Sequence, residues 1–68
     1  MLILVNEKNE AFQGFSETSI DFQKYDKEGN QITIFYNQEY ALKEQHILSK
    51  CKIKTNILPL IDWIGNNK

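Results

Sequence analysis

Hydrophobic and polar residues alternate along two neighbouring stretches in the first half of the chain, residues 19–25 and 31–36. Alternation with a period of two is typical of a half-buried strand. The polar segment between the two stretches contains Gly29, which can adopt the positive φ that a tight turn requires. The pattern therefore predicts a β-hairpin. One face of this hairpin would collect the apolar side chains of Ile20, Phe22, Ile32, Ile34 and Tyr36.

The first fifteen residues follow the same pattern. An apolar run at 2–5 and a second run at 11–15 flank a polar turn, in which Asn9 takes the place that Gly29 holds in the other hairpin. Asparagine tolerates the left-handed backbone conformation, and Gly14 interrupts the second run as a β-bulge would. Two hairpins in succession predict a four-stranded antiparallel meander. Because residues 2–5 are apolar on both faces, this strand must be covered from two sides.

Residues 38–49 are rich in helix-forming residues and follow Asn37, a residue type that favours the N-cap position. The sequence predicts a helix here. The helical wheel is imperfect, because Glu44 falls within the apolar arc and Leu42 lies outside it. A strand over the same residues therefore stays open as an alternative.

The last third of the chain predicts two further elements. Residues 50–57 alternate strictly between apolar or small side chains and lysines, which indicates a fifth, half-buried strand. Residues 57–64 fit a short helix, since Pro59 is tolerated in a first helical turn and Gly65 can end the helix. Asn56 is the candidate N-cap of this helix.

The predicted fold class is α+β. It consists of a small antiparallel β-meander of four to five strands, one helix and a short C-terminal helix, with a five-stranded partly open β-barrel as the alternative. At 68 residues the chain is large enough for one small domain, spanning 1–68, and too short for a second.

The C-terminal segment is more apolar than so short a chain can readily enclose. A helix that is apolar around its whole circumference needs cover on all sides, and uncovered apolar surface often marks a protein interface. We expect these residues to bind a partner protein or a second copy of the chain, with tryptophan as the natural anchor. The alternative is that they only close the open end of the sheet. The candidate partner-binding residues are Leu58, Leu60, Ile61, Trp63 and Ile64.

A row of lysines is the only basic cluster in the sequence. On one face of a strand, Lys50, Lys52 and Lys54 would be spaced at about 6.6 Å, close to the interval between phosphates along a nucleic acid strand. Binding of a polyanion is therefore an alternative function. The chain contains no arginine, and no aromatic residue lies between these lysines to stack on a base. Lysines on an edge strand also discourage pairing between sheets, so nucleic acid is the less favoured partner.

The sequence offers little catalytic or metal-binding chemistry. His46 is the only histidine and Cys51 the only cysteine, and the predicted fold places them on different elements. A nucleophile activated by a base and a structural zinc site would both need more such residues than the chain has. Gly-rich phosphate-binding loops are absent. We therefore expect no enzyme activity, no metal, no cofactor and no small-molecule substrate.

The remaining expectations concern location and role. The longest apolar runs are far shorter than the roughly 20 residues of a membrane helix. The apolar run at 1–5 is followed at once by polar residues, unlike a secretory signal, so a cytoplasmic location is expected. The leading functional hypothesis is a non-enzymatic protein-interaction module, with a homodimer as one form of that interaction. Small size and a composition rich in Lys, Ile and Asn suggest an accessory or inhibitor protein of a phage or mobile element, or a structural subunit of a phage particle.

Overall fold

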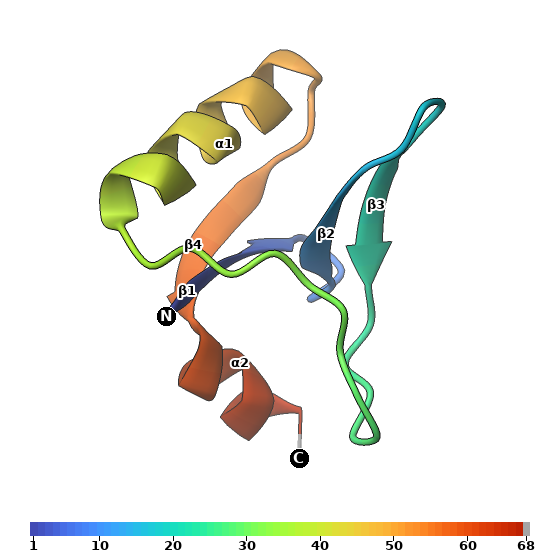
Figure 1. The fold of residues 1–68 in the computed structure, drawn as a ribbon, viewed down its shortest axis with the longest axis vertical. Helices are drawn as coiled ribbons and strands as arrows, with labels where there is room; N and C mark the ends of the chain where they lie inside the picture. The colour runs from blue at the N-terminus through green and yellow to red at the C-terminus, as the bar shows by residue number, and fades with distance from the viewer. Residues whose placement is uncertain (68) are drawn as a thin grey trace.

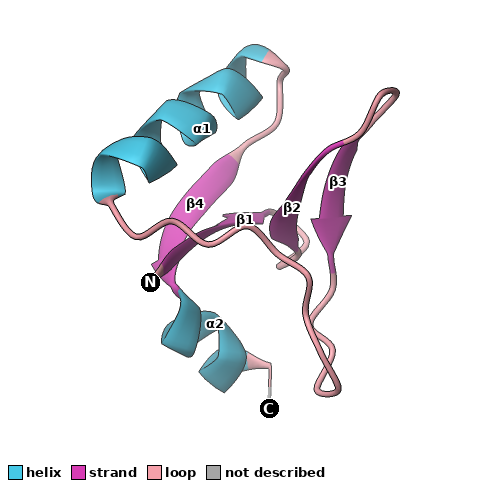
Figure 2. Ribbon diagram, in the orientation of Figure 1, coloured by secondary structure: helices cyan, strands magenta, loops and turns pink. Residues whose placement is uncertain are grey.

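A four-stranded antiparallel sheet with two helices forms the fold, which the computed structural model describes for residues 1–67 (Figures 1 and 2). The sheet is open, in the strand order β3-β2-β1-β4. The predicted α+β class is thus confirmed, and the sheet does not close into the alternative barrel. The elements are β1 (Leu2–Asn6), β2 (Ala11–Phe15), β3 (Ile20–Gln23), α1 (Gln38–Lys50), β4 (Thr55–Pro59) and α2 (Leu60–Asn66).

Both faces of the central strand β1 are covered, as its continuous apolar sequence predicted. Leu4 points into a cluster beneath α1, which supplies Ala41 and Leu48. Ile3 and Val5 point to the opposite face, into a second cluster that α2 completes with the buried Trp63 and the half-buried Leu60 and Ile64. Side chains of one strand alternate between the two faces of a sheet. The core therefore has two layers, with β1 between them.

The N-terminal hairpin forms as predicted. β1 and β2 are antiparallel, and their turn is closed by Asn6, whose Oδ1 accepts hydrogen bonds from the backbone N–H groups of Lys8 at 3.0 Å and Glu10 at 2.9 Å. Asn9 has a φ of 63°, which confirms the left-handed position expected of it. Gly14 has a φ of 153° at a shift in the β2–β3 register, which confirms the predicted bulge.

The second predicted hairpin is wrong in its second strand. β3 pairs with β2 and not with residues 31–36. Phe35 and Leu2 of β1 instead exchange two backbone hydrogen bonds of 2.8 Å, and the N–H of Thr33 donates to the carbonyl of Phe12 on β2 at 3.0 Å. The segment therefore runs between β1 and β2, whose register holds the single pair Val5↔Ala11.

Burial explains why residues 31–36 take this path. Ile32 and Ile34 pack against the cluster on the α2 side, whereas Phe35 lies in the cluster on the α1 side. The backbone N–H and C=O of Leu2 that point toward the gap are satisfied at the same time. A hairpin with β3 would have buried only one face of the segment. Residues 31–36 form no backbone ladder with β3, but the side chain of Gln23 supplies one contact in its place: its Oε1 accepts a hydrogen bond from the backbone N–H of Gln31 at 2.8 Å.

Helix α1 confirms the predicted helix over 38–49 and its N-cap. The Asn37 side chain accepts a hydrogen bond from the backbone N–H of Glu39 at 2.7 Å. The helix continues to Lys50, so the predicted strand over 50–57 is wrong in its first half, and β4 begins only at Thr55. The predicted helix over 57–64 likewise starts later, at Leu60, because the residues before it pair with β1.

Candidate functional site

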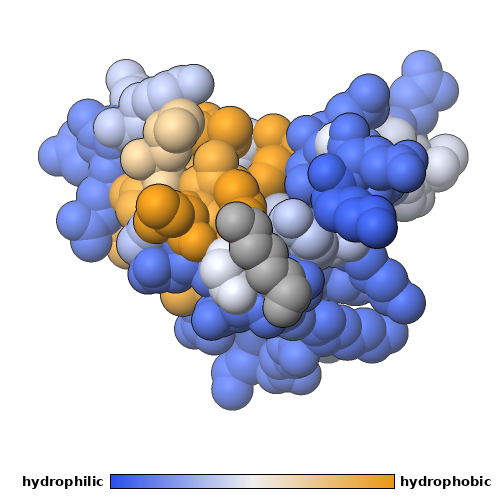
Figure 3. Space-filling model, turned by 90° about the horizontal axis from the view of Figure 1, so that it is seen from below, coloured by the Kyte–Doolittle hydropathy of each residue, from blue (hydrophilic) through white to orange (hydrophobic). Residues whose placement is uncertain are grey.

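An apolar patch on the surface is the feature that most clearly points to binding. Figure 3 shows it as a continuous orange area surrounded largely by polar residues. Its members surround a hollow of about 340 Å³. Ile61 is 77% exposed and Met1 is 65% exposed. We call this surface the apolar patch, formed by Met1, Pro59, Leu60, Ile61 and Ile64.

The patch follows from the sequence of α2. Successive residues of a helix are rotated by about 100°, and the buried Trp63 fixes which side of α2 faces the sheet. Leu60 and Ile64 then flank the buried side and are half-buried, while Ile61 turns outward. The apolar arc of α2 is wider than the sheet can cover. Met1 joins this arc because its carbonyl accepts the backbone N–H of Leu60 at 2.9 Å.

The structure divides the five predicted partner-binding residues into two groups. Leu60, Ile61 and Ile64 lie together in the apolar patch. Leu58 lies outside the patch and packs, half-buried, against the core cluster on the α2 side, which Leu60 and Ile64 also contact.

The prediction of Trp63 as the anchor of an interface is wrong for this conformation. Its side chain is 0% exposed. The indole Nε1 donates to the backbone carbonyl of Asn9 at 3.0 Å, and the ring meets Tyr25 edge-to-face at 5.5 Å between centroids. An indole whose faces and N–H all have partners inside the protein has none to offer a second molecule. Trp63 is thus part of the core and holds α2 against the sheet.

The patch also contains two residues that the sequence did not single out, Met1 and Pro59. Pro59 could have been found, since it lies directly between two predicted site residues. Met1 could not, because its place beside α2 depends on the pairing of β1 with β4.

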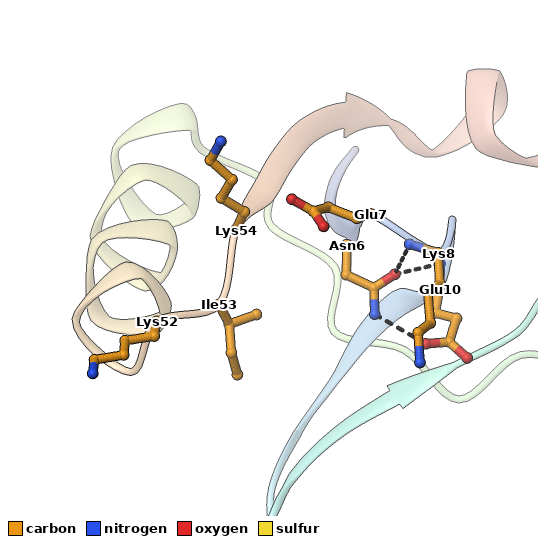
Figure 4. Close-up of a pocket in the computed structure, with 7 residues that line it drawn as sticks. All are labelled: Asn6, Glu7, Lys8, Glu10, Lys52, Ile53 and Lys54. Atoms are coloured by element: carbon orange, nitrogen blue, oxygen red, sulfur yellow. Dashed lines mark hydrogen bonds between the residues drawn. The ribbon is translucent and has the colours of Figure 1, made fainter.

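The three lysines proposed for polyanion binding do not form a row. Lys50 ends α1, Lys52 has a φ of 65° in the turn that follows, and Lys54 precedes β4. Figure 4 shows the side chains of Lys52 and Lys54 pointing away from each other. The strand spacing that would have matched a series of phosphates is therefore absent.

Acidic side chains also share the hollow to which these lysines belong. Lys52 and Lys54 line a space of about 340 Å³ together with a third lysine, Lys8, and two carboxylates, Glu7 and Glu10 (Figure 4). Carboxylates beside the lysines repel a phosphate backbone and reduce the net attraction. The geometry therefore gives no support to the polyanion alternative.

The single histidine and the single cysteine, to which the sequence assigned no catalytic role, both lie on the surface. His46 lies on α1 and Cys51 follows that helix, and both are exposed. Across residues 1–67, no three His, Cys, Asp or Glu side chains are grouped so that they could hold a metal ion. Neither of the two helices in residues 1–67 is long enough and apolar enough to cross a membrane.

Comparison with known proteins adds no relative: no protein-family model, no curated protein and no solved structure matches the chain. The functional argument therefore depends on the geometry of the molecule alone.

Proposed function

We propose that the chain is a non-enzymatic protein-binding module whose contact surface is the apolar patch. The observation that carries the proposal is the gathering of exposed apolar side chains around one hollow at α2. Exposed apolar residues scattered singly are ordinary, but a contiguous group around a concave surface marks an interaction site. The partner is a protein, in keeping with the cytoplasmic accessory or inhibitor role expected from the sequence.

Magnitudes support this reading. Full burial of an isoleucine or methionine side chain is worth about 1.5 to 3 kcal/mol. Ile61 and Met1 leave most of this free energy unused in the isolated chain. A partner that inserts one or two large apolar side chains into the hollow would recover it. The exposed carboxylate of Asp62 stands next to Ile61 in α2, so a partner with a basic residue beside its apolar anchor fits best.

The test is a capture experiment with the tagged full-length chain and matched variants. Ile61→Lys places a charge at the most exposed position of the patch and leaves the core untouched. We expect it to weaken partner binding by about 30-fold or more, the effect of losing a central anchor of about 2 kcal/mol. The readout is the amount of partner retained from a lysate of the source cells, with affinity then measured on the purified partner.

The control is Ile47→Lys, which makes the same change at an exposed isoleucine of α1 outside the patch. We expect this variant to bind the partner as the wild type does. Retention of the partner by Ile61→Lys, or an equal loss with both variants, would show that the apolar patch is not the contact surface.

A further inference from the structure

The sheet has an open edge at β4, the last strand in the order β3-β2-β1-β4 (Figure 1). The register tells which residues point outward from it. Leu2 bonds to Phe35 on one side of β1 and is paired with Pro59 on the other, so its N–H and C=O point away from β4. Backbone groups alternate sides along a strand. The residues of β4 directed away from β1 are therefore Thr55, Ile57 and Pro59.

Two of these three residues are already partly satisfied or blocked. The carbonyl of Thr55 accepts a hydrogen bond of 2.7 Å from the side-chain Nε2 of Gln45 on α1. Pro59 has no N–H, and as the N-cap of α2 it uses its carbonyl for the first bond of that helix. Ile57 keeps both its N–H and its C=O without a partner among residues 1–67. The open edge thus presents one complete donor–acceptor pair at its centre.

One side of α1 lies beside this edge. Its residues enclose, with Lys54 and Thr55, a hollow of about 370 Å³. Leu42 is 47% exposed there. Thr55 also carries the one buried side-chain polar atom that lacks a hydrogen-bond partner among the described residues, its Oγ1. An unsatisfied buried hydroxyl needs an explanation, and here it lies in the wall of an incomplete groove. The helix flank consists of Leu42, Gln45, His46 and Ser49.

We propose that a second copy of this chain occupies the edge, with the two β4 strands antiparallel and centred on Ile57. The two Ile57 residues then exchange two N–H···O=C bonds. In this register Thr55 of each copy lies opposite Pro59 of the other. The N–H that proline lacks is thereby matched to the Thr55 carbonyl, which needs no donor because Gln45 already satisfies it. The edge is thus complementary to itself at Ile57 and at the Pro59 nitrogen, while the Thr55 N–H faces a Pro59 carbonyl that also accepts the first bond of α2.

A strand of unrelated sequence fits the same edge less well. At the ends of β4 it would present one N–H to the carbonyl that Gln45 occupies and one carbonyl to a proline without an N–H. Proline and neighbouring lysines at a sheet edge oppose indiscriminate pairing. The edge thus excludes most strands but accepts its own copy.

Charge favours the same arrangement. Lys54 is exposed directly before β4 and Asp62 is exposed shortly after its end. Antiparallel pairing directs Lys54 of each copy toward the end where Asp62 of the other copy lies, whereas parallel pairing would bring the two Lys54 side chains together. Opposite charges across an interface set its register and orientation. The net charge of −1 adds little repulsion between copies.

The experiment compares Leu42→Lys with Ile47→Lys by sedimentation equilibrium of the full chain. These residues are 47% and 46% exposed on the same helix, but only Leu42 lies on the flank beside β4. We expect the wild type and Ile47→Lys to form a dimer with twice the mass of one chain, and Leu42→Lys to dimerise at least tenfold more weakly. A wild type that stays monomeric at millimolar concentration, or equal behaviour of the two variants, overturns the proposal.

Amide hydrogen exchange on the wild type provides a second readout that no folding defect can obscure. The Ile57 N–H should exchange more slowly as protein concentration rises; an exchange rate independent of concentration would contradict the pairing. Ile61→Lys separates this inference from the proposed function, since it should lose the partner protein but keep the dimer. If Ile61→Lys abolishes the dimer and Leu42→Lys does not, the copies meet at the apolar patch and the edge pairing is wrong.

Discussion

Replacing Trp63 with alanine is expected to remove a large part of the free energy of unfolding at 25 °C. Removing a fully buried tryptophan costs about 3 to 5 kcal/mol, because the transfer free energy is lost and a cavity remains. The side chain is 0% exposed, donates a hydrogen bond to the Asn9 carbonyl and contacts Tyr25 edge-to-face. A domain of 68 residues has a total stability of only about 3 to 10 kcal/mol. One substitution can therefore use up most of that margin.

Urea denaturation followed by circular dichroism measures this effect, and two further variants calibrate it. Trp63→Phe keeps an aromatic ring but loses the N–H, so it should cost about 1 to 3 kcal/mol. Ile61→Ala removes an exposed side chain of the same helix and should change the free energy of unfolding by no more than about 0.5 kcal/mol. If Trp63→Ala were no worse than Ile61→Ala, the indole would not be holding α2 in place.

This expectation changes how binding experiments are to be interpreted. Loss of a partner in the Trp63→Ala variant would report unfolding and would say nothing of the contact surface. Ile61 is the residue to test instead, because it lies in the apolar patch and outside the core. Leu60 and Ile64 are less selective test positions than Ile61, because they line the apolar patch and also pack against the core cluster, whereas Leu58 packs against that cluster and lies outside the patch.

Local signals in the sequence were sufficient for the elements that local interactions determine. The turn at Asn9, the bulge at Gly14 and the N-cap at Asn37 all appear where residue type predicted them. Each of these positions depends on the conformational preference or side-chain hydrogen bonding of one residue. The two-sided burial of β1 was also readable, because it needs only a continuous apolar run.

The path of residues 31–36 could not be read from the sequence. Their alternation suits a strand paired with β3 as well as a segment between β1 and β2. What decides between them is the gap left where β1 and β2 diverge, since filling it buries Ile34 on one face and Phe35 on the other. That gap exists only in the folded molecule. A local sequence pattern determines the conformation of a segment more readily than it determines which strands the segment pairs with.

The candidate site shows the same limit. The sequence indicated that residues 57–64 carry more apolar surface than their own domain needs, but a seven-residue helix has too few turns to reveal which face is buried. Trp63 decides this by packing against the sheet, and Ile61 is thereby left outside. The alternating lysines led to a wrong strand prediction over residues 50–57 for a related reason. α1 extends through Lys50, and the turn at Lys52 breaks the apparent strand.

Replacing Phe12 with alanine is expected to destabilise the other layer of the core to a similar extent. Phe12 is buried among Leu4, Ala41 and Leu48, and its ring meets Phe22 edge-to-face at 5.8 Å between centroids. Loss of a buried phenylalanine costs about 3 to 5 kcal/mol. Because this cluster joins α1 to the sheet, we expect helical circular dichroism and the β-sheet signal to be lost in one transition.

Phe15→Ala is the matched control, because it removes the same side chain from the same strand at a position that is 51% exposed. Its ring also contacts Phe12, at 5.3 Å between centroids, so a cost of about 0.5 to 1.5 kcal/mol is expected from the aromatic pair. Equal destabilisation by the two alanine variants would contradict the separation of β2 into a buried and an exposed half. If the helical circular dichroism signal of the Phe12→Ala variant persisted after its sheet had unfolded, α1 would not depend on this cluster.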